Sequence, residues 1–191
     1  YNNLTPFDFE KFLSWADRYV WIESTSGGDS FSTADEFYRK KTLERLGKFR
    51  VKYNSWVEPS VVNGVSVKSI DEYLSDVDFV WLASETKWSF IHGDMQFDNI
   101  IYNKESGKFT IIDWRTDFAG DMFGDMYYDL AKMLGGIYLS YKSVKEDIFK
   151  YEEADGDVSI NIPSVNNVNE YVSILQNWVS EKGYDWSKVV T

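Results

Sequence analysis

Three polar side chains in one stretch of the chain have the types and the spacing that phosphoryl transfer requires. Residues 90–99 read FIHGDMQFDN, and Asp113 follows Asn99 by fourteen residues. Transfer of a phosphoryl group to a hydroxyl needs a carboxylate that orients the hydroxyl and accepts its proton, and it needs oxygen ligands for Mg²⁺ at the phosphates. The spacing predicts Asp94 as this base, and Asn99 and Asp113 as the Mg²⁺ ligands. A neutral amide beside one carboxylate completes the metal shell without adding repulsive charge.

A predicted β-hairpin explains how residues this far apart in the sequence can meet. Residues 99–102 and 109–112 are rich in β-branched and aromatic side chains, and a polar turn separates them. Antiparallel pairing of two such strands brings their outer ends to within roughly 5 Å of each other. We interpret His92, the one histidine of the sequence, as a structural residue that braces the loop rather than as an acid or a base.

Most of the remaining chain has the apolar spacing of helices. The predicted helices are residues 7–22, a long helix that follows residues 32–36, residues 69–77, residues 125–141 and residues 166–179. Residues 54–68 are expected to be irregular or briefly extended, with a turn at Asn63 and Gly64. The sequence thus predicts an α+β fold, mainly helical, around one short hairpin.

The long second helix carries most of the basic residues in the first half of the chain. The spacings Ser32 to Asp35 and Thr33 to Glu36 predict capping boxes at its start. Phe37 and the apolar residues up to Tyr53 are expected on one side. We expect its basic residues to form a solvated face; they are Arg39, Lys40, Lys41, Arg45, Lys48, Arg50 and Lys52.

Composition excludes several classes of protein. The 191 residues carry a net charge of −11, which argues against a sequence-independent nucleic-acid binder. The sequence has no cysteine and one histidine, so disulfides, thiol nucleophiles and HExxH-type zinc sites are excluded. No apolar run reaches the roughly 18 residues that a membrane span needs, and no signal peptide is visible. We therefore expect a cytoplasmic protein. Residues 91–130 are the most acidic stretch per residue, which suits either a divalent cation or a solvated surface.

The stretch from about residue 88 to residue 134 resembles the catalytic and metal-binding segments of the aminoglycoside phosphotransferase and choline kinase superfamily, which has a protein-kinase-like fold. Protein kinases use H-R-D-x-x-x-x-N and D-F-G. Here Gly93 replaces the arginine, so the small-molecule kinases are the closer match. Residues 124–131 read GDMYYDLA, similar to a family segment that opens a core helix. The resemblance implies that Asp129, and with it Asp125, supports the catalytic loop.

The same resemblance implies a single kinase-like C-terminal lobe over residues 1–191. Residues 1–87 would be a helical part before the catalytic loop, residues 88–134 the catalytic loop, metal hairpin and core helix, and residues 135–191 the C-terminal helices. Family members also have an N-terminal lobe with a glycine-rich loop and a strand lysine. The sequence contains no G-x-G-x-x-G and does not begin with methionine. We therefore expect a fragment or a processed form that lacks the N-terminal lobe and whose ATP turnover is impaired.

The resemblance implies an ATP- and Mg²⁺-dependent kinase that acts on a hydroxyl of a small molecule. Net negative charge favours a cationic acceptor such as choline, and a sugar or aminoglycoside hydroxyl is the next candidate. Aromatic residues that could line its pocket are Trp88, Trp114, Tyr127, Tyr128 and Trp178, although core packing would also explain them. Two other functions remain open: a catalytically silent kinase-like binding or regulatory module, and a Mg²⁺-dependent phosphohydrolase that uses the same carboxylates on water.

Overall fold

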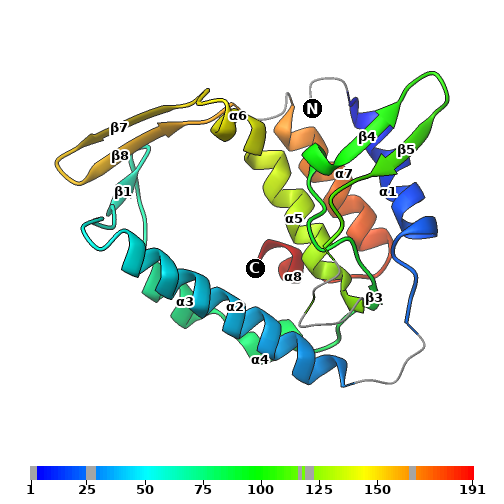
Figure 1. The fold of residues 1–191 in the computed structure, drawn as a ribbon, viewed down its shortest axis with the longest axis horizontal. Coiled ribbons are helices and arrows are strands. Elements are labelled where there is room, and N and C mark those ends of the chain that lie inside the picture. The colour runs from blue at the N-terminus through cyan, green and yellow to red at the C-terminus, as the bar shows by residue number, and fades with distance from the viewer. Residues whose placement is uncertain (1–3, 25–28, 116–117, 119–122, 164–166) are drawn as a thin grey trace.

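The structure is a computed structural model that describes residues 4–24, 29–115, 118, 123–163 and 167–191. Its fold is mixed α+β, with helices as the larger part (Figure 1). The helices are α1 (Pro6–Tyr19), α2 (Ser30–Lys52), α3 (Ile70–Asp76), α4 (Phe79–Ala83), α5 (Met126–Tyr138), α6 (Tyr141–Lys145), α7 (Val168–Glu181) and α8 (Trp186–Val190), with a 3₁₀ turn, η1 (Phe97–Asn99). The strands are β1 (Val61–Val62), β2 (Val65–Ser66), β3 (Trp88–Phe90), β4 (Ile100–Asn103), β5 (Lys108–Ile111), β6 (Phe123–Asp125), β7 (Lys150–Ala154) and β8 (Asp157–Asn161).

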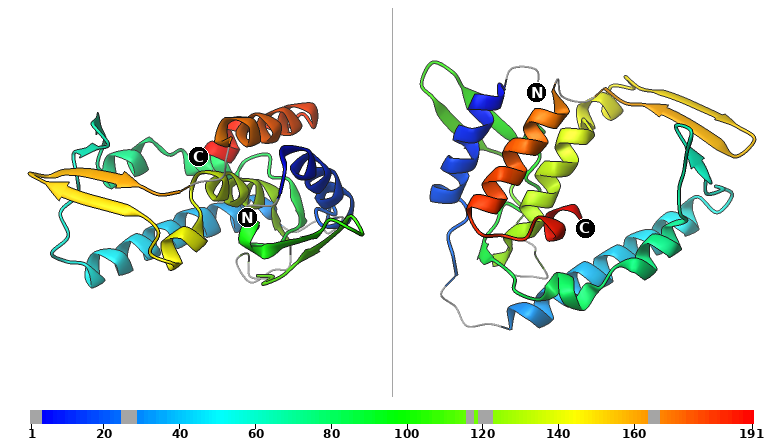
Figure 2. Two further views of the ribbon diagram at one scale, coloured as in Figure 1. Left: turned by 90° about the horizontal axis from the view of Figure 1, so that it is seen from above. Right: turned by 180° about the vertical axis from the view of Figure 1, so that it is seen from behind.

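Three helices, α1, α5 and α7, pack side by side and form the core (Figure 2). Each presents an apolar stripe at helical spacing, represented by Phe12 on α1, Leu130 on α5 and Leu175 on α7, all fully buried. Burial of each such side chain contributes roughly 1.5–3 kcal/mol. Helix α1 starts with a capping box between Thr5 and Asp8. The predicted helices over residues 7–22, 125–141 and 166–179 are thus confirmed, each with ends that differ by a few residues.

Two short antiparallel β-ladders flank the loop that follows β3. Strands β4 and β5 form the predicted hairpin, with Ile100 opposite Ile111. Strand β3 pairs with β6, so that Ser89 lies opposite Gly124. The β3–β6 ladder joins the start of the loop that follows β3 to the start of α5. The loop is therefore fixed to the start of the core helix at the side where the loop begins.

The second half of α2 projects away from the core toward a four-stranded sheet of order β2-β1-β8-β7 (Figure 1). The prediction of one hairpin was wrong, because β1–β2 and β7–β8 are hairpins as well. Asn63 and Gly64 both have positive φ and form the β1–β2 turn where a turn was predicted. No helix in the described part of the chain is long and apolar enough to cross a membrane.

Helix α2 differs from the prediction at its start and along its face. Its N-cap is Asp29, whose side chain accepts a hydrogen bond from Ser32 N at 3.0 Å, so the predicted capping boxes at Ser32 and Thr33 do not form. Of the apolar side predicted from Phe37 to Tyr53, Phe37 is buried while Tyr53 is 47% exposed. The reason is that the three-helix core contacts only the first half of α2. Helix α3, in contrast, begins with a capping box at Ser69, in the segment predicted to start a helix.

Candidate active site

The backbone of the loop between β3 and η1 is held by a buried carboxylate of α5. Asp129 accepts hydrogen bonds from the backbone N–H groups of His92 and Gly93, both at 2.8 Å, and from Trp21 Nε1 at 3.1 Å. Burial raises the pKa of Asp129, and these N–H donors act in the opposite direction. Because every donor is an N–H group, the arrangement suits the carboxylate form. Asp129 thus fixes the main chain directly before Asp94.

A second attachment joins this loop to the segment that follows the β4–β5 hairpin. Arg115 N donates to His92 O at 2.9 Å. Gly93 has a φ of +79°, and a Cβ at this position would overlap with the carbonyl oxygen of Arg115. Glycine is required here for two reasons, since its backbone is left-handed and its neighbour leaves no room for a side chain. This close approach accounts for the glycine at position 93 in this chain.

His92 links the same two segments through its ring. Its Nδ1 accepts a hydrogen bond from Asp94 N at 3.2 Å, so the proton resides on Nε2, which donates to Ile112 O at 2.8 Å. The side chain is fully buried, and its ring centroid lies 4.9 Å from that of Trp114. With both nitrogens engaged by the backbone, His92 has the contacts of a bracing residue.

The carboxylate of Asp94 is largely buried and is surrounded by donors. Lys132 Nζ lies 2.9 Å from Oδ1, and an Arg115 guanidinium nitrogen lies 3.2 Å from Oδ2. Gln96 Nε2 also donates to Oδ1, at 2.8 Å. Burial alone would raise the pKa of Asp94, but the hydrogen bond and charge of Lys132, with Gln96 and Arg115, outweigh burial and hold that pKa below its usual value. Asp94 is therefore an ionised carboxylate fixed in orientation.

Sequence reasoning missed the role of Lys132, Arg115 and Gln96. Lys132 lies three residues after Asp129 on α5, and residues at this spacing share a helix face. That spacing is the signal that could have identified it. Arg115 lies two residues after Asp113, and Gln96 lies two residues after Asp94. That both side chains point at the Asp94 carboxylate depends on the hairpin and on the turn of the loop, which local spacing does not reveal.

Asn99 and Asp113 lie at the two ends of the β4–β5 hairpin. Asn99 Nδ2 donates to Asp94 O at 2.8 Å, and Asn99 O accepts from Ile112 N at 3.0 Å. Asp113 directly follows Ile112 and is exposed, with a left-handed φ of +58°. The hairpin therefore places the backbone of both predicted ligands beside the Asp94 loop.

These two residues fit a magnesium ion that is held together with a nucleotide. The amide oxygen of Asn99 and the carboxylate of Asp113 are hard oxygen donors, and Mg²⁺ commonly takes one or two protein ligands plus phosphate and water. In the described part of the chain no group of three histidine or acidic side chains could hold a metal alone. Asp117 and Asp121, which belong to the acidic stretch predicted for a cation, lie outside the described residues.

Asp125 joins three parts of the structure at the start of α5. It is the N-cap of α5 and is fully buried, and its carboxylate accepts hydrogen bonds from Tyr38 Oη at 2.9 Å and from Lys87 N at 3.0 Å. Burial raises the pKa of Asp125, opposed by the hydrogen bond from Tyr38 and by the backbone donors. Asp125 thus ties α2 and the residue before β3 to the core helix. None of these hydrogen bonds involves Asp94.

The predicted aromatic residues are dispersed. Trp88 packs edge-on against Phe118, while Trp178 packs against Trp21 at 5.5 Å. The buried Tyr127 accepts a hydrogen bond from the backbone of Asp185. Trp114 covers His92, and only Tyr128 among the five lines the pocket beside the loop. Four of the five are thus accounted for by packing.

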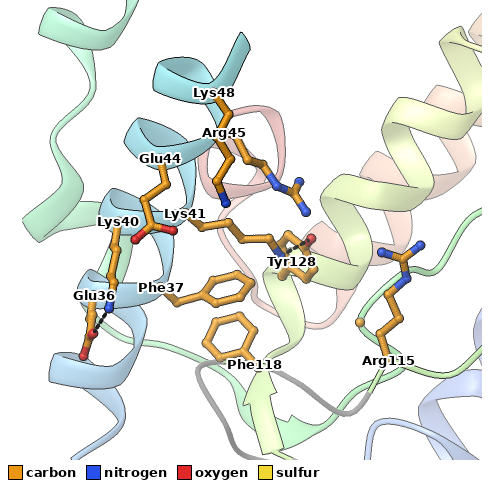
Figure 3. A pocket seen from close by; sticks show the side chains of 11 residues that line it. Glu36, Phe37, Lys40, Lys41, Glu44, Arg45, Lys48, Arg115, Phe118 and Tyr128 are labelled. Carbon is orange, nitrogen blue, oxygen red and sulfur yellow. Dashed lines mark hydrogen bonds and ion pairs between the residues drawn. The ribbon is translucent and has the colours of Figure 1, made fainter. Parts of the chain in front are cut away.

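The pocket beside the catalytic loop has a volume of about 510 Å³ and lies between α2 and the start of α5 (Figure 3). Its lining residues are Glu36, Phe37, Lys40, Lys41, Glu44, Arg45, Lys48, Gly93, Arg115, Phe118 and Tyr128. Part of the basic face of α2, expected to be solvated, therefore faces this cavity. Lys41 Nζ crosses it to donate to Tyr128 Oη at 2.9 Å.

A loop aspartate, an asparagine five residues later and a second aspartate after a hairpin have the order and spacing of a kinase-type phosphotransfer loop. Comparison with known families agrees with this assignment. The model of the phosphotransferase enzyme family matches residues 12–149, well over half of the chain, and the protein belongs to this family, part of the aminoglycoside phosphotransferase and protein-kinase-like superfamily. No match was found among curated proteins or among solved structures.

Proposed function

We propose that the protein transfers the γ-phosphoryl group of ATP to a hydroxyl of a small molecule, with Asp94 as the base. The observation that carries the proposal is the position of Asp94. The main chain of the two residues before it is held by Asp129, its carboxylate is oriented by Lys132, and Asn99 is hydrogen-bonded to its carbonyl. Such preorganisation is what phosphoryl transfer asks of a protein, because positioning and charge stabilisation supply most of its catalysis.

In the proposed reaction, the acceptor oxygen forms a bond to the γ-phosphorus while the bond from that phosphorus to the β-bridging oxygen breaks. ADP leaves, and the hydroxyl proton passes to the Asp94 carboxylate. Asn99 and Asp113 would hold Mg²⁺, which neutralises charge on the phosphates. Lys132 and Arg115 lie where they orient Asp94 and add positive charge near the transferred group.

We further propose that the chain is the C-terminal lobe of a kinase-like enzyme of the cytoplasm, where ATP is supplied. The described residues before the catalytic loop form α1 to α4 and the β1–β2 hairpin, an order typical of a helical lobe and not of a nucleotide-covering sheet. For this reason the experiment uses the longest natural form of the protein.

The test is ADP release from Mg²⁺-ATP in the presence of choline, ethanolamine, sugars, sugar phosphates and aminoglycosides. We expect acceptor-dependent release that falls by about 10²–10⁴-fold in Asp94→Asn. The matched control is Asp98→Asn, an exposed aspartate of the same loop, which should retain full activity. Phosphate release without any alcohol would support a phosphohydrolase. Nucleotide binding without turnover would support a silent kinase-like module, and absence of nucleotide binding would overturn the proposal.

A further inference from the structure

The pocket between α2 and the catalytic loop is rich in positive charge, although the chain as a whole carries −11. In Figure 3 the side chains of Lys41, Arg45 and Lys48 extend from α2 toward Tyr128 and Arg115. The lining contains two acidic residues: Glu36 is paired with Lys40 at 3.2 Å, and Glu44 lies within ion-pair distance of no cation that the structure describes. Against these two carboxylates stand five cations, so the lining carries an excess of positive charge.

Three of these cations have no carboxylate partner among the residues that the structure describes. The ion pairs of α2 within this region use other residues, and none of Lys41, Arg45 and Lys48 lies within ion-pair distance of an acidic side chain in the described part of the chain. Lys41 instead lies 4.0 Å from the ring centroid of Phe37 and donates to Tyr128. Clustered cations without counter-charges repel one another, and a bound anion would relieve that repulsion.

The pocket extends to two residues that adjoin the proposed base. Gly93, directly before Asp94, belongs to its lining. Arg115 lines the pocket and also lies 3.2 Å from the Asp94 carboxylate, so one guanidinium connects the cavity with the base. A molecule held by the α2 cations would therefore have its remaining groups beside Asp94.

We propose that this pocket binds the acceptor and that the acceptor is a hydroxyl compound bearing a phosphate or carboxylate group, recognised by Arg45, Lys48 and Lys41. The inference rests on the proposed phosphotransferase function and names its substrate class. Arginine and lysine make charge-assisted hydrogen bonds with both anionic groups. A cationic acceptor such as choline, which net charge alone favours, would meet like charge in this pocket.

The experiment is isothermal titration calorimetry on the longest natural form with four probes: glucose 6-phosphate, glucuronate, glucose and choline. The first two probes distinguish phosphate from carboxylate recognition. Each titration is repeated in saturating ADP and Mg²⁺. The variants are Arg45→Gln and Lys48→Gln, and the matched control is Lys52→Gln, an exposed lysine of the same helix outside the pocket.

We expect at least one anionic probe to bind ten times more tightly than glucose, and either pocket variant to weaken this binding about tenfold, while Lys52→Gln leaves it unchanged. Binding should persist in saturating ADP. Equal affinity for anions and glucose, or anion binding indifferent to Arg45→Gln, would overturn the inference. Competition between the anion and ADP would assign the pocket to the nucleotide and equally overturn it.

The outcomes separate this inference from the proposed function. ADP release with choline that Arg45→Gln leaves unchanged would retain the phosphotransferase and refute the anionic acceptor. Arg45-dependent anion binding in a protein that transfers no phosphate from ATP would retain the anion specificity of the pocket and refute the phosphotransferase.

Discussion

Lys132 Nζ lies 2.9 Å from Asp94 Oδ1, so a cation of α5 is ion-paired with the carboxylate that we propose as the base. Asp129, three residues earlier on the same helix, accepts hydrogen bonds from the backbone of the same loop. One face of α5 therefore positions both the main chain and the side chain of the catalytic loop. The two contacts are separable by mutation.

Replacement of Lys132 by methionine should alter the pH dependence of activity. Because Lys132 helps to hold the pKa of Asp94 below its usual value, its loss raises that pKa. Activity that needs the carboxylate form is lost as the pH falls through the pKa of Asp94, so the acidic limb of the kcat/KM profile should move to higher pH. The control is Lys145→Met, an exposed lysine of α6. An acidic limb at the wild-type position would refute the assignment.

Replacement of Asp129 by asparagine should lower stability. The amide would present an NH₂ group to at least one of three N–H donors and leave a buried donor unpaired, at a cost of roughly 1–3 kcal/mol. The midpoint of urea unfolding at pH 7 measures this cost. Asp98→Asn, which removes an exposed carboxylate from the loop, should leave the midpoint within error. Equal midpoints for the two variants would contradict the supporting role of Asp129.

Gly93→Ala and Gly107→Ala form a matched pair of variants. Both positions have positive φ, +79° and +65°, so alanine carries a similar backbone strain of roughly 1–2 kcal/mol at each. A Cβ at residue 93 would overlap with Arg115 O, whereas one at residue 107 meets no heavy atom within 4 Å. Gly93→Ala should therefore lose more unfolding free energy and also lose activity. Equal losses of free energy in the two variants would refute the close approach.

The pairing of the segments that carry Asn99 and Asp113 was predictable because one short hairpin joins them, whereas the contacts of Asp129 and Lys132 with the Asp94 loop join distant residues. Asn99 and Asp113 are fourteen residues apart, and the hairpin pairs Ile100 with Ile111 as its β-rich residues predict. The β7–β8 hairpin was missed although Asp155–Gly156 is a strong turn signal. Strand β7 is exposed throughout, so it lacks the alternation of apolar and polar residues that marks a half-buried strand.

The pocket was not predictable because it depends on how distant elements meet. Cations at three- and four-residue spacing on α2 look like a solvated face in the sequence. They face a cavity because the Tyr38–Asp125 hydrogen bond and the Phe37–Phe118 stacking at 3.8 Å hold the first half of α2 against the start of α5. These contacts join residues more than eighty positions apart. No local pattern encodes them.

The protonation of Lys41 supplies a last prediction, one that concerns anion binding. Burial, followed by the charges of Arg45, Lys132 and Arg115, lowers the pKa of Lys41 to about 8, and the smaller effect of the Asp94 charge acts in the other direction. Tyr128 faces the ammonium as a hydrogen-bond partner. Lys41 therefore begins to lose its proton just above neutral pH.

A bound anion favours the charged ammonium and raises the pKa of Lys41. Above pH 8, binding must then take up a proton, so affinity should fall by up to about tenfold per pH unit. Glucose 6-phosphate is a dianion throughout this range, since phosphate monoesters lose their second proton near pH 6. Calorimetry at pH 7.5, 8.5 and 9.5 measures the slope, and Lys41→Met should bind more weakly and with a flat profile. A slope that persists in Lys41→Met would locate the titrating group elsewhere.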